Sequence, residues 1–208
     1  MITEEVDIII APVRWDDTLQ PRVNPPSATE WEKWLPTFRV RVAEWHSNLT
    51  KEGQLFVLVD SWMMHHVRLE LEQSFGEGTV LNEIIWVERA GKAQSDRWNQ
   101  QYQAVFWVVK TPKKFTFNFD DMERIPYMAP GLVSKEKAAR GKTPTDVWWH
   151  SRIPQEEFPE HTPPPLFWQR LLRVHTGKNA RVRALDECTR AVELAMESEP
   201  LSGRFALI

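Results

Sequence analysis

Glycine is scarce in this chain. It contributes only 8 of the 208 residues, although an average usage of about 7% would give roughly 15. Glycine has no side chain, so it is the residue that lets a backbone approach a phosphate or nucleotide closely. Proline outnumbers it, with 15 residues. The sequence therefore has few positions for a glycine-rich nucleotide-binding loop.

Cysteine is scarcer still, because Cys188 is the only one. A single cysteine excludes an internal disulfide and a cysteine-rich zinc site, and it is typical of a reducing compartment. We expect Cys188 to be buried as a small apolar side chain. The adjacent His65 and His66 have no carboxylate or cysteine partner at metal-ligand spacing, so we predict no metal site.

Long hydrophobic runs and a large charge of one sign are also absent. No apolar run approaches the ~18–20 residues of a membrane span, and residues 1–5 are acidic where a signal peptide would be basic. The formal net charge is −3, so nucleic-acid binding would need a local basic face. These features predict a cytoplasmic protein without membrane contact, with a single domain over residues 1–208.

What the chain contains instead is an alternation of apolar runs and amphipathic stretches. Strands are predicted at 6–10, 54–60, 81–88 and 102–110. Ser27 and Glu30 form a capping-box pattern, which predicts the start of a helix with Pro36 in its first turns. Further helices are predicted at 62–74, 166–174 and 186–198. This order indicates an α/β sheet, mostly parallel with an antiparallel edge ribbon, and an irregular insertion at 112–160.

Tryptophan is abundant, with 11 residues. Those at helical or strand spacing are expected in the core or at an interface, namely Trp31, Trp34, Trp45, Trp86 and Trp107. Four others lie near predicted loops and are candidates for stacking on a base, namely Trp15, Trp98, Trp148 and Trp149.

Several stretches, in this order, resemble one family: the amino-group DNA methyltransferases that modify adenine N6 or cytosine N4. The resemblance is carried by VDIIIAP at 6–12, GQLFVLVD at 53–60, NEIIW at 82–86, YQAVFWVVK at 102–110 and HTPPP at 161–165. The order is similar to that of the permuted (beta) class, in which the catalytic half precedes the cofactor half. The resemblance implies a Rossmann-like methyltransferase sheet, truncated in the cofactor half, with a target-recognition region at 112–160.

The family's catalytic motif ends a strand with Asp, Asn or Ser, two prolines and an aromatic residue. These residues accept hydrogen bonds from the target amine and stack on the flipped base. The matching positions here are Ala11, Pro12, Val13 and Arg14, of which only Pro12 agrees. Ala11 has no acceptor, and Arg14 puts a guanidinium in place of the ring. The resemblance thus implies a degenerate catalytic motif, in which Arg14 or Trp15 could still stack on a base.

The cofactor motif is also degenerate. The family binds S-adenosylmethionine (SAM) with a Gly-x-Gly loop between a strand and a helix, but here Gly177 is followed by no glycine until Gly203. We expect the chain to pass from the preceding helix almost directly to Asp186 and Glu187, without that strand and loop. No bound cofactor is therefore predicted. Weak candidates for SAM contact are Asp60, for which a helix N-cap is the alternative, His161 and Asp186.

Candidate nucleic-acid contacts are basic or aromatic residues near these motifs. They are Arg14, Trp15, Arg89, Lys92, Arg97, Lys135, Lys137, Arg140 and Lys142. A solvated surface is the alternative for each basic stretch, including a second one at 170–183.

Three functions remain open on the sequence. The first is a catalytically inactive methyltransferase-like protein that binds DNA, a methyltransferase or restriction-type partner, or a second copy of itself. The second is an active SAM-dependent DNA amino-methyltransferase with an atypical motif or a completing subunit. The third is a structural or inhibitory protein that does not contact nucleic acid. We favour the first, in a restriction-modification or other host-defence setting.

Overall fold

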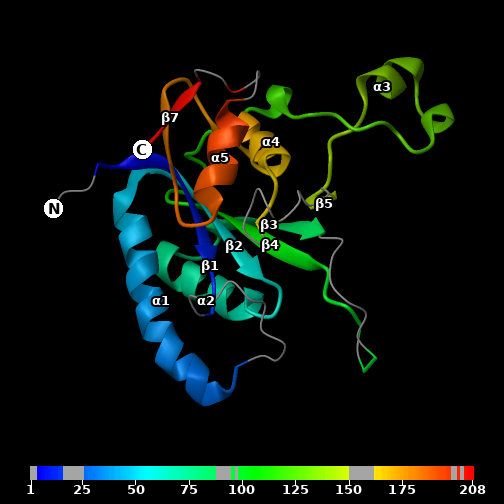
Figure 1. Ribbon diagram of the computed structural model, residues 1–208. Helices are drawn as coiled ribbons and strands as arrows, with labels where there is room; N and C mark the ends of the chain where they lie inside the picture. The colour runs from blue at the N-terminus through cyan, green and yellow to red at the C-terminus, as the bar shows by residue number, and fades with distance from the viewer. Residues whose placement is uncertain are drawn as a thin grey trace.

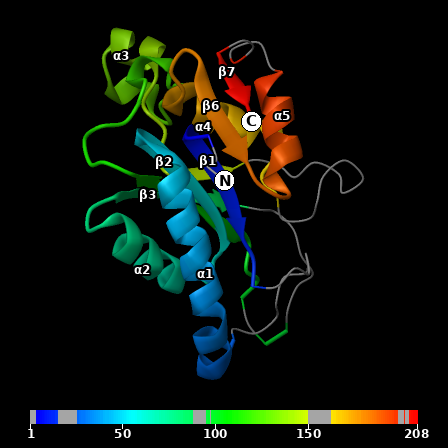
Figure 2. The ribbon, with the colours of Figure 1, turned by 90° about the vertical axis from the view of Figure 1, so that its left-hand side faces the viewer.

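The computed structural model describes residues 4–15, 26–87, 95–96, 98–149, 162–197, 201 and 204–208. Within them, a seven-stranded sheet has the order β5-β3-β4-β2-β1-β6-β7. Helices cover both of its faces (Figures 1 and 2). The predicted α/β architecture is confirmed.

The sheet is mostly parallel. Its strands are β1 (Val6–Val13), β2 (Leu49–Asp60), β3 (Val80–Val87), β4 (Tyr102–Val109), β5 (Val147–Trp149), β6 (Ala180–Ala184) and β7 (Phe205–Leu207). Strand β1 runs parallel to β2 and β6, β6 to β7, and β3 to β5. Only β4 is antiparallel to its neighbours β2 and β3. The predicted antiparallel ribbon is therefore β3–β4, with the short β5 outside it at the edge.

The bounds of the helices are α1 (Ala28–Asn48), α2 (Met64–Phe75), α3 (Lys135–Arg140), α4 (Pro165–His175) and α5 (Cys188–Met196). Helices α1 and α2 cover one face of the sheet and α4 and α5 the other, whereas α3 lies outside both layers. Alternate residues of β1 point to opposite faces: Ile8 and Ile10 join the core under α4 and α5, whereas Ile9 joins the core under α1 and α2.

Helix α1 begins as its sequence predicts. The Ser27 Oγ accepts a hydrogen bond from the Glu30 backbone N–H, and the Glu30 carboxylate accepts one from the Ser27 N–H at 2.8 Å. Pro36, however, lies in the helix interior rather than in its first turns. Its ring is on the exposed side of the helix, where the lost intrahelical hydrogen bond can be replaced by water.

Strand β6 corrects an expectation from the sequence. The chain does not pass directly from α4 to Asp186, because residues 180–184 form a strand parallel to β1 and are followed by α5. Val182 is fully buried, while Arg181 and Arg183 point outward and donate hydrogen bonds to Glu4. The strand expected to be missing is thus present, and the helix predicted at 186–198 follows it as α5, without a glycine loop between them.

Residues 122–146 form an arm that projects from the body of the molecule (Figure 1). It contains α3 and is closed at its base by a bridge between Ile125 and Lys142. Gly141 permits this closure, because its φ is +76° and an added Cβ would lie 2.9 Å from the Ile125 carbonyl oxygen. The segment predicted as irregular therefore carries a short helix and returns to the sheet as β5.

Two connections diverge between β1 and β6. From β1 the chain crosses through α1 to β2, and from β6 it crosses through α5 to β7 on the other side. In open α/β sheets, such a switch in direction leaves a crevice at the carboxyl ends of the two strands, where ligands bind.

Candidate functional site

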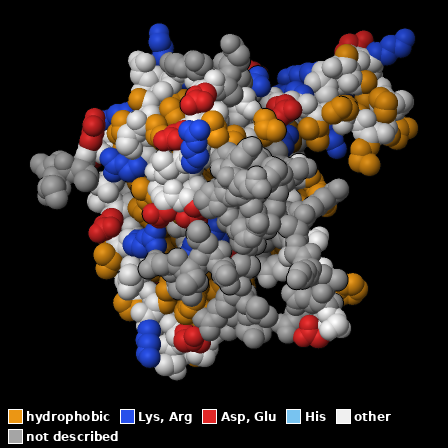
Figure 3. Space-filling model, viewed as in Figure 1, with side chains coloured by type: hydrophobic (Ala, Val, Ile, Leu, Met, Phe, Trp, Pro, Cys, Tyr) orange, Lys and Arg blue, Asp and Glu red, His pale blue; other side chains and the backbone are white. Residues whose placement is uncertain are grey.

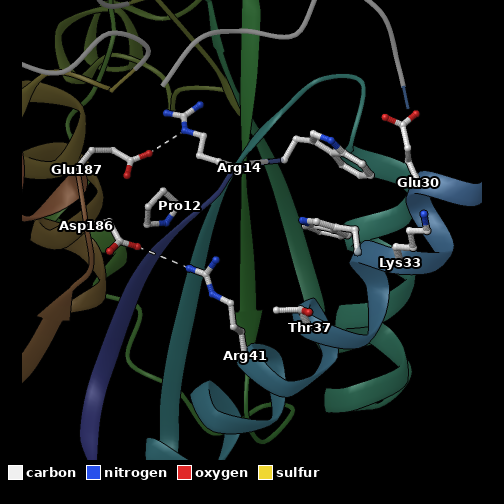
Figure 4. Close-up of a pocket in the computed structure, with 10 residues that line it drawn as sticks. Pro12, Arg14, Glu30, Lys33, Thr37, Arg41, Asp186 and Glu187 are labelled. Atoms are coloured by element: carbon white, nitrogen blue, oxygen red, sulfur yellow. Dashed lines mark hydrogen bonds and ion pairs between the residues drawn. The ribbon is translucent and has the colours of Figure 1, made fainter. Parts of the chain in front are cut away.

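A cavity of about 880 Å³ lies at the carboxyl ends of β1 and β6. Its walls are Pro12, Arg14 and Trp15 at the end of β1, one face of α1, and the loop from β6 to α5 (Figure 4). We call it the β1–β6 cleft. It occupies the position that the change of strand direction predicts for a ligand site.

Arg14 lies across this cleft. Its Nε donates to Glu187 Oε1 at 2.7 Å and its Nη1 to Asp60 Oδ1 at 3.2 Å. All three side chains are largely buried, with exposed fractions of 16% for Arg14, 8% for Glu187 and 12% for Asp60. Two carboxylates around one guanidinium make strong, charge-assisted hydrogen bonds that also satisfy the buried charges. The pairs join the end of β1 to the end of β2 and to the start of α5.

Asp60 does not cap the helix that follows it. The N-cap of α2 is Met63, which makes no side-chain capping bond, and only the Asp60 backbone carbonyl accepts a hydrogen bond there, from Met63 N–H. The helix-cap alternative for Asp60 is wrong, because its carboxylate is engaged by Arg14.

Only two of the four motif positions reach the cleft. Pro12 and Arg14 line it, whereas Ala11 and Val13 are fully buried in the core on the α1 side of the sheet. This follows from the two-residue period of a strand, which sends neighbouring side chains to opposite faces.

Trp15 belongs to an aromatic cluster beside the cleft. Its ring is stacked on Trp34 at 5.6 Å between centroids and lies edge-on to Trp31 at 4.8 Å. Trp62 also lies within 6.0 Å of it. Stacking of Trp15 on a base stays a prediction, and its ring is already in contact with three others.

Sequence reasoning missed the contribution of α1 to the cleft. Lys33, Thr37 and Arg41 line it, and their four-residue spacing places them on one helical face. Trp34 also lines the cleft, although its helical spacing indicated a core residue. The four-residue spacing of Lys33, Thr37 and Arg41 indicates a polar face of α1, but the sequence does not show that this face borders the ends of β1 and β6.

The loop from β6 to α5 is built from Leu185, Asp186 and Glu187 and contains no glycine. Asp186 adopts φ +48°, a left-handed conformation that aspartate tolerates better than most residues. Its carboxylate lies 3.6 Å from Arg41, with both side chains partly exposed, so this pair contributes little.

The remaining nucleic-acid candidates lie elsewhere. Lys135, Lys137 and Arg140 are exposed on α3, with Lys142 just after it. Figures 1 and 2 both place α3 far from the carboxyl end of β1. The structure therefore does not bring the arm residues together with Arg14. Arg89, Lys92, Arg97 and His161 lie outside the described residues.

The other residues singled out from the sequence differ in their exposure to solvent. Trp98 is 97% exposed, and Trp149 is 64% exposed. Cys188 is buried as predicted, and its burial raises the pKa of the thiol. Burial beside Trp31 is the main reason that the pKa of His66 is lowered.

Neither a metal centre nor a membrane span is found in the described part of the chain. No three His, Cys, Asp or Glu side chains are grouped there as ligands, and none of its helices has the length and apolarity to cross a bilayer.

Comparisons with known proteins give consistent likenesses. A family model described as DNA methylase, of the N6/N4 type, matches residues 25–182. The DNA adenine methyltransferase YhdJ of Escherichia coli K12 is 24% identical over 124 residues, which are 58% of this chain and 38% of that protein. The chain thus matches well under half of that relative's length.

Two solved structures are similar over almost the whole chain. The complex of M1.HpyAVI with SAM has a TM-score of 0.60 at 17% identity, over 99% of this chain and 82% of that one. The PvuII cytosine-N4-specific DNA methyltransferase has a TM-score of 0.68 at 12% identity, over 99% and 74%. These two likenesses show a common Rossmann-like fold.

Proposed function

The chain belongs to the N6/N4 DNA methylase family, and from that premise we propose that it binds DNA through this fold without itself transferring a methyl group. A protein partner or a second copy of the chain is part of the proposal.

The observation that carries the proposal is the position of Arg14. Amino-group methylation needs acceptors for the hydrogens of the target amine, and a guanidinium has donors only. Asp60 and Glu187, the two carboxylates that flank Arg14, each accept a hydrogen bond from it. Ala11 faces the opposite side of the sheet. No side chain at the motif positions therefore offers a free acceptor to an amine.

The residues around the cleft also fit SAM poorly. The loop at 185–187 has a side chain at every position, so its backbone cannot approach a ligand as a glycine loop does. We therefore derive no methyl transfer through this cleft.

The arm supports the DNA part of the proposal. Lys135, Lys137 and Arg140 are exposed on α3, and Met128 and Leu132 nearby are 94% and 87% exposed. Figure 3 shows basic and apolar side chains together on this projection. Basic groups bind backbone phosphates, and exposed apolar side chains beside them can contact a groove.

The outer strands of the sheet support the part of the proposal that concerns a protein partner or a second copy of the chain. The outermost strands, β5 and β7, have three residues each. Val147 and Trp149 of β5 are 43% and 64% exposed. Exposed apolar side chains such as these, on the outermost strand of a sheet, form a surface that another chain can cover.

The first test is calorimetry of the full chain with SAM, together with transfer of labelled methyl groups to duplex DNA. We expect no binding at micromolar affinity and no label on the DNA. Micromolar binding or labelled DNA would instead establish the active methyltransferase.

The second test is retention on duplex DNA as a function of salt. We expect binding at ~50 mM salt that weakens steeply as the salt concentration rises, because phosphate contacts release counterions. No binding at ~50 mM salt would remove the DNA part and leave a structural or inhibitory role.

A further inference from the structure

A second, smaller cavity of about 270 Å³ lies between the outer face of α4 and the base of the arm. We call it the α4–arm hollow. Leu166, Gln169, Arg170 and Arg173 line it from α4, and Glu123 lines it from the arm. The spacing of the four helical residues places them on one face of α4. None of them belongs to the β1–β6 cleft.

Arg170 is held in the hollow with part of its hydrogen-bonding capacity unused. Its guanidinium carbon lies 5.0 Å from the Trp148 ring centroid, and only 16% of its side chain is exposed. Its Nε is buried without a hydrogen-bond partner in the described part of the chain. The Glu123 carboxylate lies 3.7 Å away, which is beyond hydrogen-bond distance.

A buried donor without an acceptor is costly, so such a group in a native protein indicates a missing partner. The missing partner must be an acceptor, because every polar hydrogen of a guanidinium is a donor. It must also be small enough for the hollow. A water molecule would satisfy one donor, but it would leave the surplus positive charge uncompensated.

The charge around the hollow selects an anion. Among the described residues that line the hollow, two are arginines and one is a carboxylate, that of Glu123, whose side chain is 63% exposed and can turn away to solvent. A guanidinium held over an aromatic ring still has its N–H groups available to other acceptors, and their planar fork matches the oxygens of a phosphate.

We propose that the α4–arm hollow binds a phosphate group, with Arg170 and Arg173 as its donors. Gln169 adds an amide donor, and Leu166, 65% exposed, lies beside the group that carries the phosphate. The phosphate belongs either to the backbone of DNA, in which case the inference rests on the proposed function, or to a free phosphate or nucleotide.

Arg173→Gln is the test variant, because Arg173 is partly exposed and its loss should leave the fold intact. Arg190→Gln is the matched control. Arg190 lies on α5, is 59% exposed and pairs with Glu193 outside the hollow. Arg170→Lys is the second variant, since it keeps the charge and removes the planar fork. Thermal unfolding of each variant confirms that it folds.

Inorganic phosphate is titrated first, with tryptophan fluorescence as the readout, because Trp148 lies against Arg170. We expect a saturable change that weakens by roughly tenfold in Arg173→Gln and Arg170→Lys, as for loss of one charge-assisted contact, and is unchanged in Arg190→Gln. Equal titrations in all four proteins, or no saturation, overturn the proposal.

Duplex DNA distinguishes the source of the phosphate. If it is the DNA backbone, Arg173→Gln lowers DNA affinity and reduces the salt slope by about 1, and DNA competes with inorganic phosphate. If it is a free phosphate, the titration is lost in the variant while DNA binding is unchanged. DNA binding with no phosphate site overturns this inference and leaves the proposed function standing. A phosphate site without DNA binding supports this inference and overturns the DNA part of the proposed function.

Discussion

Arg14 and Arg170 are buried to the same degree, with 16% of each side chain exposed, but their surroundings differ. Arg14 is bound by two carboxylates at 2.7 and 3.2 Å. Arg170 has one carboxylate at 3.7 Å and a buried Nε without a hydrogen bond. Burial of a charge therefore does not identify a binding site by itself.

The difference is in how completely each guanidinium is satisfied. The protein supplies the partners of Arg14, so this arginine lies across the β1–β6 cleft and joins three elements of the fold. The partners of Arg170 are incomplete, so an acceptor from outside can bind there at a net gain. The same residue type is thus a structural element at one site and a candidate ligand-binding group at the other.

The largest expected effect is on stability, from Arg14→Ala. This substitution leaves Asp60 and Glu187 buried without their cation, and we expect the free energy of unfolding to fall by about 2–4 kcal/mol. Urea unfolding measures it. Arg190→Ala, which breaks an exposed pair on α5, should cost less than about 1 kcal/mol. Equal losses in the two variants would show that the hydrogen bonds of the buried Arg14 contribute no more to stability than the exposed ion pair of Arg190.

The same Arg14→Ala protein reports on DNA. If its DNA affinity equals that of the parent chain, the β1–β6 cleft is not a nucleic-acid site, and the arm remains the candidate.

A third buried group, the neutral side chain of His175, makes stability depend on pH. His175 is buried, its Nδ1 lies 3.0 Å from Gln54 Oε1, and Trp107 Nε1 donates to the same oxygen at 2.8 Å. Because a glutamine Oε1 only accepts, we assign the Nδ1 proton to His175. Burial lowers the pKa of His175 to about 3.

Below pH ~6.5, His175 is therefore protonated in the unfolded chain but stays neutral in the folded chain. Stability should be unaffected by this group above pH ~6.5 and should fall as the pH decreases toward 3, with a slope approaching 1.4 kcal/mol per pH unit. At pH 4 the loss is about 3 kcal/mol. Unfolding of His175→Gln across this range should show a shallower slope, and an equal slope would assign the pH dependence elsewhere.

Neutralising the arm should have a smaller effect on free energy and act on binding alone. The triple change of Lys135, Lys137 and Arg140 to Gln removes three exposed charges, and we expect the salt slope of DNA binding to drop by about 2–3. Stability should be unchanged, because α3 buries no residue. Filter binding at several salt concentrations measures the slope. A slope equal to that of the parent chain would exclude the arm from the DNA interface.

The smallest effect is expected from Glu123→Gln. The change removes the carboxylate that competes for Arg170, so phosphate affinity in the α4–arm hollow should rise by roughly two- to threefold. Fluorescence titration compares the variant with the parent chain. Weaker phosphate binding would mean that Glu123 holds Arg170 in place rather than competing with its ligand.

Much of the fold could be predicted from local sequence patterns. The Ser27–Glu30 capping box and the apolar runs of the four central strands depend only on neighbouring residues, and each was found, with β1 and β2 longer than predicted. Strand β6 was missed because its two arginines break the apolar run and it has only five residues. Its strand character depends on pairing with β1 and on the contacts of those arginines with Glu4.

The site was less predictable, because its contacts join distant parts of the chain. Arg14 is separated from Asp60 by 46 residues and from Glu187 by 173. The sequence identified Arg14 and Asp60 as candidates, and Glu187 lies next to the candidate Asp186, yet it could not show that Arg14 pairs with Asp60 and Glu187. Arg170 and Trp148 likewise meet only through packing of α4 against the edge of the sheet.

Strand β1 receives its second neighbour very late. It pairs with β2 on one side, but on the other side it pairs with β6, which begins at Ala180. During synthesis on the ribosome, one edge of this apolar strand therefore stays open until β6 has emerged. Non-local pairing of this kind slows folding, and an open strand edge is prone to aggregation. The nascent chain should accordingly depend on chaperones until β6 and the Arg14–Glu187 pair close that edge.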